Sequence, residues 1–239
     1  ASAISNEGIE FEAQYDIIRK KNWNWSVGLN LSHNKNMLRK TYNGEDLNDK
    51  VLGRPVYGIY TFKDEGIVQK EEDIPMYPNA SGKLTPLYFQ SVNNPLRVGG
   101  RKIKDQNFDG VIDDKDLYYA GSTLPAVYGG LNSHLEWKGL SFDVLFSYTI
   151  GRKVMNMYKN SAFTFTKDFG VIMNYFHAND FWTPDNRGAK YPSLEFADKD
   201  YIGQFDGNVD SNIENISFLR LKQLVIGYQF PKTWLKGTF

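Results

Sequence analysis

The residues best suited to chemistry in this sequence form an acidic segment, residues 105–116, which reads DQNFDGVIDDKD. Side chains with oxygen atoms recur at alternate positions, and Gly110 stands sixth, where calcium-binding loops make a sharp turn. Because calcium takes about six to eight oxygen ligands, this spacing lets several oxygens converge on one ion. The predicted ligands are five side chains and one backbone carbonyl, that of Val111: Asp105, Asn107, Asp109, Val111, Asp113 and Asp116.

The last position of this loop departs from the usual pattern. Asp116 stands where helix-flanked calcium loops have Glu, and its shorter side chain predicts weak binding, or binding through one oxygen. A calcium ion here would be structural and would hold a long loop together. The alternative is an acidic turn, rich in Asp and Gly, that binds no ion.

Catalytic patterns are absent from the sequence. The three histidines, His33, His134 and His177, are far apart and lack metal-binding spacing. No cysteine is present, which excludes disulfides and thiol catalysis, and the motifs of serine hydrolases and nucleotide-binding enzymes do not occur. With 28 basic and 28 acidic residues, the chain has no charge surplus for binding nucleic acid. We therefore expect a protein that is not an enzyme.

Five segments that must position these residues alternate apolar and polar side chains with the period of a β-strand. They are residues 8–17, 23–32, 126–137, 140–150 and 216–230. Turns at residues 19–22 and 138–139 join the first four as two hairpins, and a bulge is predicted near Lys222. Shorter β-like pieces are predicted at residues 56–62 and 66–69, and a helix after Thr166.

The two faces of these strands differ in chemistry. One face is predicted to contact lipid or the interfacial aromatic belt, through Ile9, Phe11, Tyr15, Trp23, Trp25, Leu29, Phe142, Val144 and Phe146. The other is predicted to face the interior of a barrel, through Glu10, Glu12, Asn30, Asp143 and Ser147. Aromatic residues make up 15% of a chain that is only 41% hydrophobic, a combination typical of membrane β-barrels. The alternative is a secreted, calcium-stabilised β-sandwich that binds glycans.

Short and long connections alternate along the chain. The two turns are a few residues long, whereas residues 33–125 and 151–215 are far longer than the connections of a compact domain. Outer-membrane barrels have this alternation, with short periplasmic turns and long extracellular loops. No run of about eighteen apolar residues is present, so no transmembrane helix is expected. The fold class predicted for residues 1–239 is therefore all-β, an antiparallel transmembrane barrel segment with long extracellular loops that contain short helices.

An ordered series of short motifs resembles the C-terminal barrel half of SusC/RagA-type TonB-dependent transporters. The series consists of Asn6, Gly8 and Glu10; GRP at 53–55; GIY at 58–60; DEGIVQ at 64–69; the acidic loop; Gly121, Pro125, Tyr128 and Gly130; KGLSFD at 138–143; Gly151; WTP at 182–184; Pro192; SFLRLK at 217–222; Gly227, Tyr228 and Pro231. One departure is Val98-Gly99-Gly100, where the family commonly has Pro-Gly-Asp.

This resemblance implies a Gram-negative outer-membrane importer of oligosaccharides or peptides. Its expected partners are a SusD/RagB-like surface lipoprotein that acts as a lid, TonB as the energy source, and the lipid of the outer membrane. The plug domain, the TonB-contacting segment and the last strands are expected outside this sequence, so residues 1–239 would form part of the barrel wall. In barrels of this class about twenty-two strands surround a plugged lumen.

Overall fold

The computed structural model describes residues 2–46, 50–156, 176–197, 208–231 and 234, and the chain divides into two compact units. Unit 1 consists of Ala1–Gly58, Gly121–Val154 and Asn215–Phe239, and unit 2 of Ile59–Ala120 and Met155–Glu214. The helix predicted after Thr166 begins outside the described residues. None of the described helices is long and apolar enough to cross a membrane.

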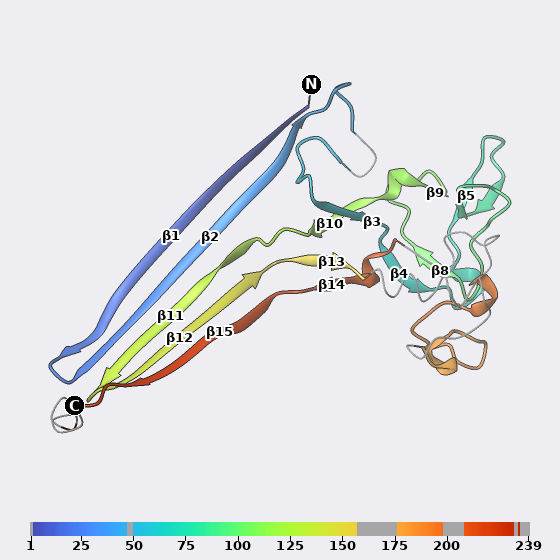
Figure 1. The fold of residues 1–239 in the computed structure, drawn as a ribbon. Coiled ribbons are helices and arrows are strands. Elements are labelled where there is room, and N and C mark those ends of the chain that lie inside the picture. Colours follow the sequence, from blue (N-terminus) through green and yellow to red (C-terminus); the bar gives the residue numbers. More distant parts are fainter. Residues whose placement is uncertain (1, 47–49, 157–175, 198–207, 232–233, 235–239) are drawn as a thin grey trace. The chain divides into compact units, whose positions relative to one another are not determined.

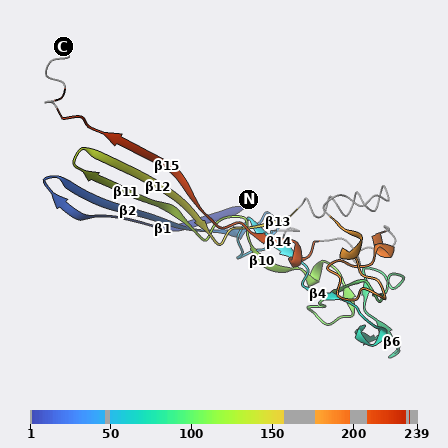
Figure 2. The same ribbon diagram turned by 90° about the horizontal axis from the view of Figure 1, so that it is seen from below.

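Unit 1 is built on a five-stranded antiparallel sheet (Figures 1 and 2), which confirms the predicted all-β fold. The strand order is β1-β2-β11-β12-β15. The strands are β1 (Ala3–Lys20), β2 (Trp23–Lys40), β11 (Val127–Trp137), β12 (Leu140–Ile150) and β15 (Phe218–Tyr228). Each pairing is antiparallel, and the two tight turns require this for β1 with β2 and for β11 with β12.

The first two strands are longer than their hydrophobic pattern predicts. β1 begins at Ala3 and β2 continues to Lys40, so the connection predicted from residue 33 begins after Lys40. Residues 5–8 of β1 and 33–36 of β2 are polar or Gly on both faces, which removes the alternating signal while the backbone ladder continues. Side-chain bonds extend the pairing there, from Asn36 to Asn6 and from Arg39 to Glu7.

Three register shifts interrupt the sheet, and the one nearest the outer end passes over Arg39 in β2. The register of β12 with β15 passes from Leu145–Gln223 to Phe146–Leu221, so Lys222 is the extra residue, as the sequence predicted. The third shift passes over Ile17 in β1, which the apparently regular pattern of that strand did not reveal. Each bulge adds one unpaired residue to a strand. The residues beyond it therefore project to the opposite face from the one that strict alternation would give them.

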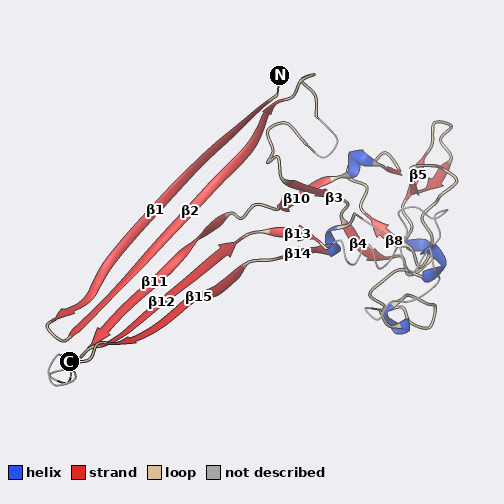
Figure 3. Cartoon of the chain, in the orientation of Figure 1, coloured by secondary structure: helices blue, strands red, loops and turns tan. Residues whose placement is uncertain are grey.

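Unit 2 contains short elements around its own apolar core (Figure 3). Its strands, some of which extend to the boundary of unit 1, are β3 (Gly58–Thr61), β4 (Asp64–Ile67), β5 (Met76–Pro78), β6 (Leu84–Pro86), β7 (Tyr88–Phe89), β8 (Arg101–Ile103), β9 (Val111–Ile112), β10 (Tyr118–Ser122), β13 (Lys153–Met155) and β14 (Ile213–Asn215). Its described helices are short 3-10 turns, η1 (Glu71–Asp73), η2 (Asp114–Asp116), η3 (Ala178–Asp180), η4 (Leu194–Ala197) and η6 (Asp210–Asn212). The predicted β-like pieces correspond to β3 and β4.

The core of unit 2 joins both long connections of the chain. Its buried members are Val68, Ile74, Leu87, Phe89, Leu96, Ile103, Ile112 and Val209. Val209 belongs to the second connection and the other seven to the first. The strands pair as β10 with β3, β13 with β14, β4 with β8, β5 with β6, and β7 with β9. The two connections therefore fold together, which their separate sequence patterns did not predict.

Candidate functional site

The polar face of the sheet follows from its register. Directly paired residues project to the same side, so Glu12, Asn30, Gly130, Ser147 and Arg220 form one row across all five strands. The neighbouring rows add carboxylates and amides, and they include His134, whose Nδ1 lies 2.5 Å from Oδ1 of Asp143. The five residues predicted to face a barrel interior all lie on this face.

The opposite face is mainly apolar where all five strands pair, and it becomes polar toward the outer ends of β1 and β2, where Glu7 pairs with Lys35. One row consists of Ala13, Leu29, Leu131, Phe146 and Leu221. All nine residues predicted to contact lipid lie on this face, whereas Ile17, which the alternation placed with them, is the bulge residue. Large side chains here are open to the surroundings: Ile9 and Leu219 are 68% exposed and Ile226 is 61% exposed. A contiguous apolar surface of this kind requires a nonaqueous partner, because water solvates it poorly.

A group of side-chain hydrogen bonds links three strands of the sheet, β2, β11 and β12. Asn30 bonds through its side chain, whose Oδ1 accepts from the Gly130 amide at 2.7 Å. The Asn30 carbonyl accepts from the Tyr148 hydroxyl at 2.8 Å, and this hydroxyl lies next to Gly129. A Cβ at Gly129 would stand 2.1 Å from that carbonyl, so the contact needs glycine at this position. Tyr148 thus satisfies a backbone carbonyl on the apolar face.

The acidic loop of unit 2 is closed by its own backbone amides. Asp116 is fully buried; its Oδ1 accepts from the Gln106 amide at 2.7 Å and its Oδ2 from the Asp113 amide at 2.9 Å. Asp105 likewise accepts from the amides of Phe108 and Gly110, at 2.7 and 2.9 Å. Burial raises the pKa of the Asp116 carboxyl, and its amide donors offset this only in part. Both oxygens of each carboxylate are therefore occupied by hydrogen bonds.

The other predicted calcium ligands point to local partners. Asn107 accepts from the Asp109 amide, Asp109 from the Val111 amide and Asp113 from the Lys115 amide. The Lys115 ammonium lies 3.9 Å from Asp109 and 3.6 Å from Asp113. Within the described part of the chain, no three Asp, Glu, His or Cys side chains are grouped to hold a metal ion. The geometry does not supply a preformed calcium cage, and calcium stays a prediction from the motif.

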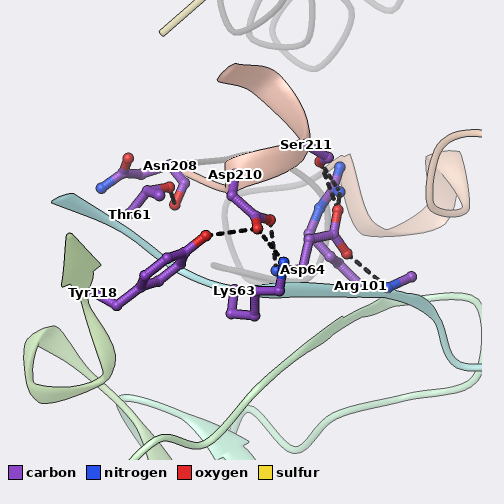
Figure 4. A network of polar contacts seen from close by, with 9 residues as sticks. Thr61, Lys63, Asp64, Arg101, Tyr118, Asn208, Asp210 and Ser211 are labelled. Atoms are coloured by element: carbon purple, nitrogen blue, oxygen red, sulfur yellow. Dashed lines mark hydrogen bonds and ion pairs between the residues drawn. The ribbon is translucent and has the colours of Figure 1, made fainter. Parts of the chain in front are cut away.

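A partly buried polar network elsewhere in unit 2 joins the two long connections (Figure 4). Asp210 of η6 accepts from the Lys63 ammonium at 2.6 Å, the Tyr118 hydroxyl at 2.8 Å and the Asp64 amide at 2.9 Å. Asp64 in turn accepts from Arg101 at 2.5 Å and from the Ser211 hydroxyl at 2.6 Å. The side chains of Arg101 and Asp64 are only 4% and 9% exposed.

This network acts as a clamp between the two long connections, because each of its acids, Asp210 and Asp64, is paired with a cationic side chain and a hydroxyl donor. Burial opposes ionisation of Asp210, but the bonds from Lys63, the Asp64 amide and Tyr118 outweigh it, so the pKa of the Asp210 carboxyl is lowered. The same hydrogen bond, with the charge of Asp210, raises the pKa of Lys63. This network could not be predicted from the sequence, since Lys63 and Asp210 are 147 residues apart.

Comparison with known proteins shows which proteins this chain is similar to. No protein-family model matches it. It is 29% identical over 241 residues to TonB-dependent receptor P26 of Formosa agariphila, covering 96% of this chain and 22% of that protein. It is 25% identical to TonB-dependent receptor SusC of Bacteroides thetaiotaomicron, covering 99% of this chain and 22% of SusC. The chain therefore spans about a fifth of the length of these relatives.

Solved structures show the same fold. The RagAB peptide importer in its closed-closed state aligns with a TM-score of 0.66 at 23% identity, over 99% of this chain and 24% of the matched one. Its open-open state aligns with a TM-score of 0.65 at 24% identity, over 99% and 23%. Nearly the whole chain is thus related to one part of the TonB-dependent receptors of the SusC/RagA type, and the resemblance predicted from its sequence is confirmed.

Proposed function

We propose that this chain forms part of the wall of a transmembrane β-barrel in an outer-membrane, TonB-dependent nutrient importer of Gram-negative type. The observation that carries this proposal is the exposed apolar face of five long strands, backed by a polar face. In a lipid bilayer the first face meets hydrocarbon and the second lines the interior, while the paired backbone leaves few polar groups toward lipid. The chain's part is structural, and it catalyses no reaction.

The proposed orientation follows from the two tight turns. They lie at one end of the sheet, where the Lys138 amide donates to the Asn22 carbonyl at 3.0 Å. We place these turns in the periplasm and unit 2 outside the cell, because short turns are periplasmic in such barrels and long loops extracellular. The acidic loop would then be extracellular, as would its predicted calcium.

The proposed cargo is an oligosaccharide, another glycan or a peptide. The description of RagAB as a peptide importer supports the peptide part of this proposal, whereas the glycan part rests on the resemblance of the sequence to SusC/RagA-type transporters. By the same resemblance, we propose a SusD/RagB-like lipoprotein lid and TonB as partners of the intact importer. The contacts with TonB would lie outside this sequence.

The alternative, a secreted glycan-binding β-sandwich, lacks its second layer in the described residues. A sandwich buries the apolar face of one sheet against another. Within the described residues of unit 1, no second sheet covers that face, since Ile9, Leu219 and Ile226 stay more than half exposed. The exposed face therefore favours a membrane strand over a sandwich strand.

Labelling of single cysteines tests this proposal in the intact importer. Cysteine replaces Asn79 in unit 2 or Lys21 in the turn, and whole cells are treated with a membrane-impermeant thiol reagent. The account predicts labelling at position 79 on intact cells, and at position 21 only after the outer membrane is permeabilised. Labelling of position 21 without position 79 on intact cells would reverse the topology and contradict the proposal.

A further inference from the structure

The outer ends of β1 and β2 continue past the last residues of β11 and β12 (Figure 1). On β2 the apolar face runs from Trp23 to His33, which is about 34 Å along the strand. With the usual tilt of barrel strands this is about 26 Å along the membrane normal, close to the apolar band of about 25 Å in such barrels. His33 therefore marks the outer edge of the hydrocarbon, given the proposed function on which this inference rests.

Past this edge, the face that contacts lipid becomes cationic. Lys35 and Lys40 project to the same side as Ile9, because their partners in β1 alternate with it. Arg39, the extra residue of the register shift in β2, lies on this side too, since its guanidinium donates to Glu7 at 2.9 Å. The opposite face of the same segments is uncharged, and it consists of Ile4, Asn6, Gly8, Asn34, Asn36 and Leu38. The positive charge is therefore confined to the side that faces the membrane.

The two lysines are available to an anion. Lys35 and Lys40 are exposed, and no carboxylate among the described residues forms an ion pair with either of them. Glu7 is the one carboxylate on this side of the paired segments, and it already accepts from the arginine. The next acids along the chain, Glu45 and Asp46, accept hydrogen bonds within their own loop. Three cationic side chains against one carboxylate leave a surplus of positive charge.

The height of this cationic strip, formed by Lys35, Arg39 and Lys40, indicates the size of the headgroup that it fits. Lys35 lies about 5 Å above the hydrocarbon edge, at the depth of lipid phosphates, and Lys40 lies about 10 Å higher. The headgroup layer of a phospholipid bilayer is only about 5–7 Å thick on each side, so it ends below Lys40. A lipid with a taller headgroup that carries phosphate groups spans both lysines.

We propose that the cationic strip binds the phosphate groups of a glycolipid in the outer leaflet of the membrane. The acyl chains of this lipid contact the apolar face from Ile9 inward, and phosphates on its sugar headgroup lie beside Lys35 and Lys40. Hydrogen bonds from ammonium to phosphate are charge-assisted and therefore strong. A lipid is favoured over a protein partner, because the strip continues the apolar face on the side away from the barrel interior.

The test removes two charges from the strip in the intact importer, by Lys35→Gln combined with Lys40→Gln. Both side chains are exposed and glutamine stays polar, so the variant should melt at the temperature of the wild type. The matched control, Lys70→Gln with Lys83→Gln, removes the same charge from exposed positions of unit 2. Native mass spectrometry in mild detergent, with lipid A as the titrant, measures each affinity. Dephosphorylated lipid A serves as the probe without phosphate.

Lipid A should bind the wild type, the control and the charge-conserving variant Lys35→Arg with Lys40→Arg equally, and more tightly than its dephosphorylated form. Each lysine near an anionic surface contributes about fivefold, so the glutamine variant should bind roughly 25-fold more weakly. Equal affinity of the glutamine variant and the wild type would overturn the proposal. Loss of a copurifying lipoprotein at unchanged lipid A affinity would also overturn it, because the strip would then bind protein. An importer that stays dispersed without detergent would instead refute the proposed function.

Discussion

Tyr148 shows how a single residue of the sheet meets the demands of a membrane. Its hydroxyl is the donor that reaches the Asn30 carbonyl on the apolar face. An unpaired carbonyl in hydrocarbon has no water to bond, so it would destabilise the folded state. The sequence could not reveal this contact, because it joins β12 to β2 across the intervening strand.

Replacing Tyr148 by Phe tests this role, since the ring stays and only the donor is lost. We expect the free energy of unfolding of the intact importer in lipid to fall by about 1–3 kcal/mol. The matched control is Tyr15→Phe on the same face, where Tyr15 is 70% exposed. Equal stability of the two variants would show that the Asn30 carbonyl needs no partner.

Asp210 determines how the clamp of unit 2 responds to acid. The pKa of the Asp210 carboxyl is lowered in the folded state, so its contribution to the free energy of unfolding is fully present above the unfolded pKa of about 3.9. That contribution is lost as the pH falls through the folded pKa. Hydrogen exchange of the Asp64 amide, which donates to Asp210, should therefore show constant protection down to about pH 4, once the intrinsic rate is corrected. Protection of the Asp64 amide that weakens between pH 7 and pH 5 would contradict the lowered pKa of Asp210.

The Asp210→Asn variant should lose that protection at neutral pH. A hydrogen bond to a charged group contributes about 1.5–3 kcal/mol, so exchange at Asp64 should quicken by roughly tenfold or more. Asp185→Asn, an exposed position in the same unit, serves as the control and should change nothing. An unchanged exchange rate of the Asp64 amide in Asp210→Asn would contradict the role of this network as a clamp.

At the scale of elements, the sequence predicts most of the sheet and little of unit 2. The ends of β12 and the bulge at Lys222 follow from strict alternation and its single interruption. The outer ends of β1 and β2 were missed because polar residues occupy both faces over residues 5–8 and 33–36. Unit 2 escaped prediction because it is held by contacts between distant short segments, such as Asp210 with Lys63.

The acidic loop is the element for which motif and geometry predict different behaviour. Its hydrogen bonds predict a loop that stays closed without an ion, and Asp116→Ala should open it more than Asp109→Ala, because Asp116 accepts from two amides. Limited proteolysis of the intact importer, with calcium and with chelator, measures cleavage within residues 98–125. Cleavage that rises with chelator in the wild type would establish the predicted calcium instead.

At the scale of the whole chain, the central claim is that the apolar face of the sheet contacts lipid. The residues of that face were predicted from alternation, and the register places them together, but a protein partner could also cover them. The environment of neighbouring residues on β12 distinguishes these cases. Val144 and Leu145 are both apolar, yet they lie on opposite faces.

Spin labels attached to cysteines at positions 142–147 provide the most direct measurement. In the intact importer reconstituted into bilayers, collision rates with oxygen report lipid contact, and those with a water-soluble nickel complex report aqueous contact. The account predicts high oxygen collision at 142, 144 and 146, and low values at 143, 145 and 147. Uniformly low oxygen collision, without alternation between Val144 and Leu145, would show that protein covers this face and would contradict the account.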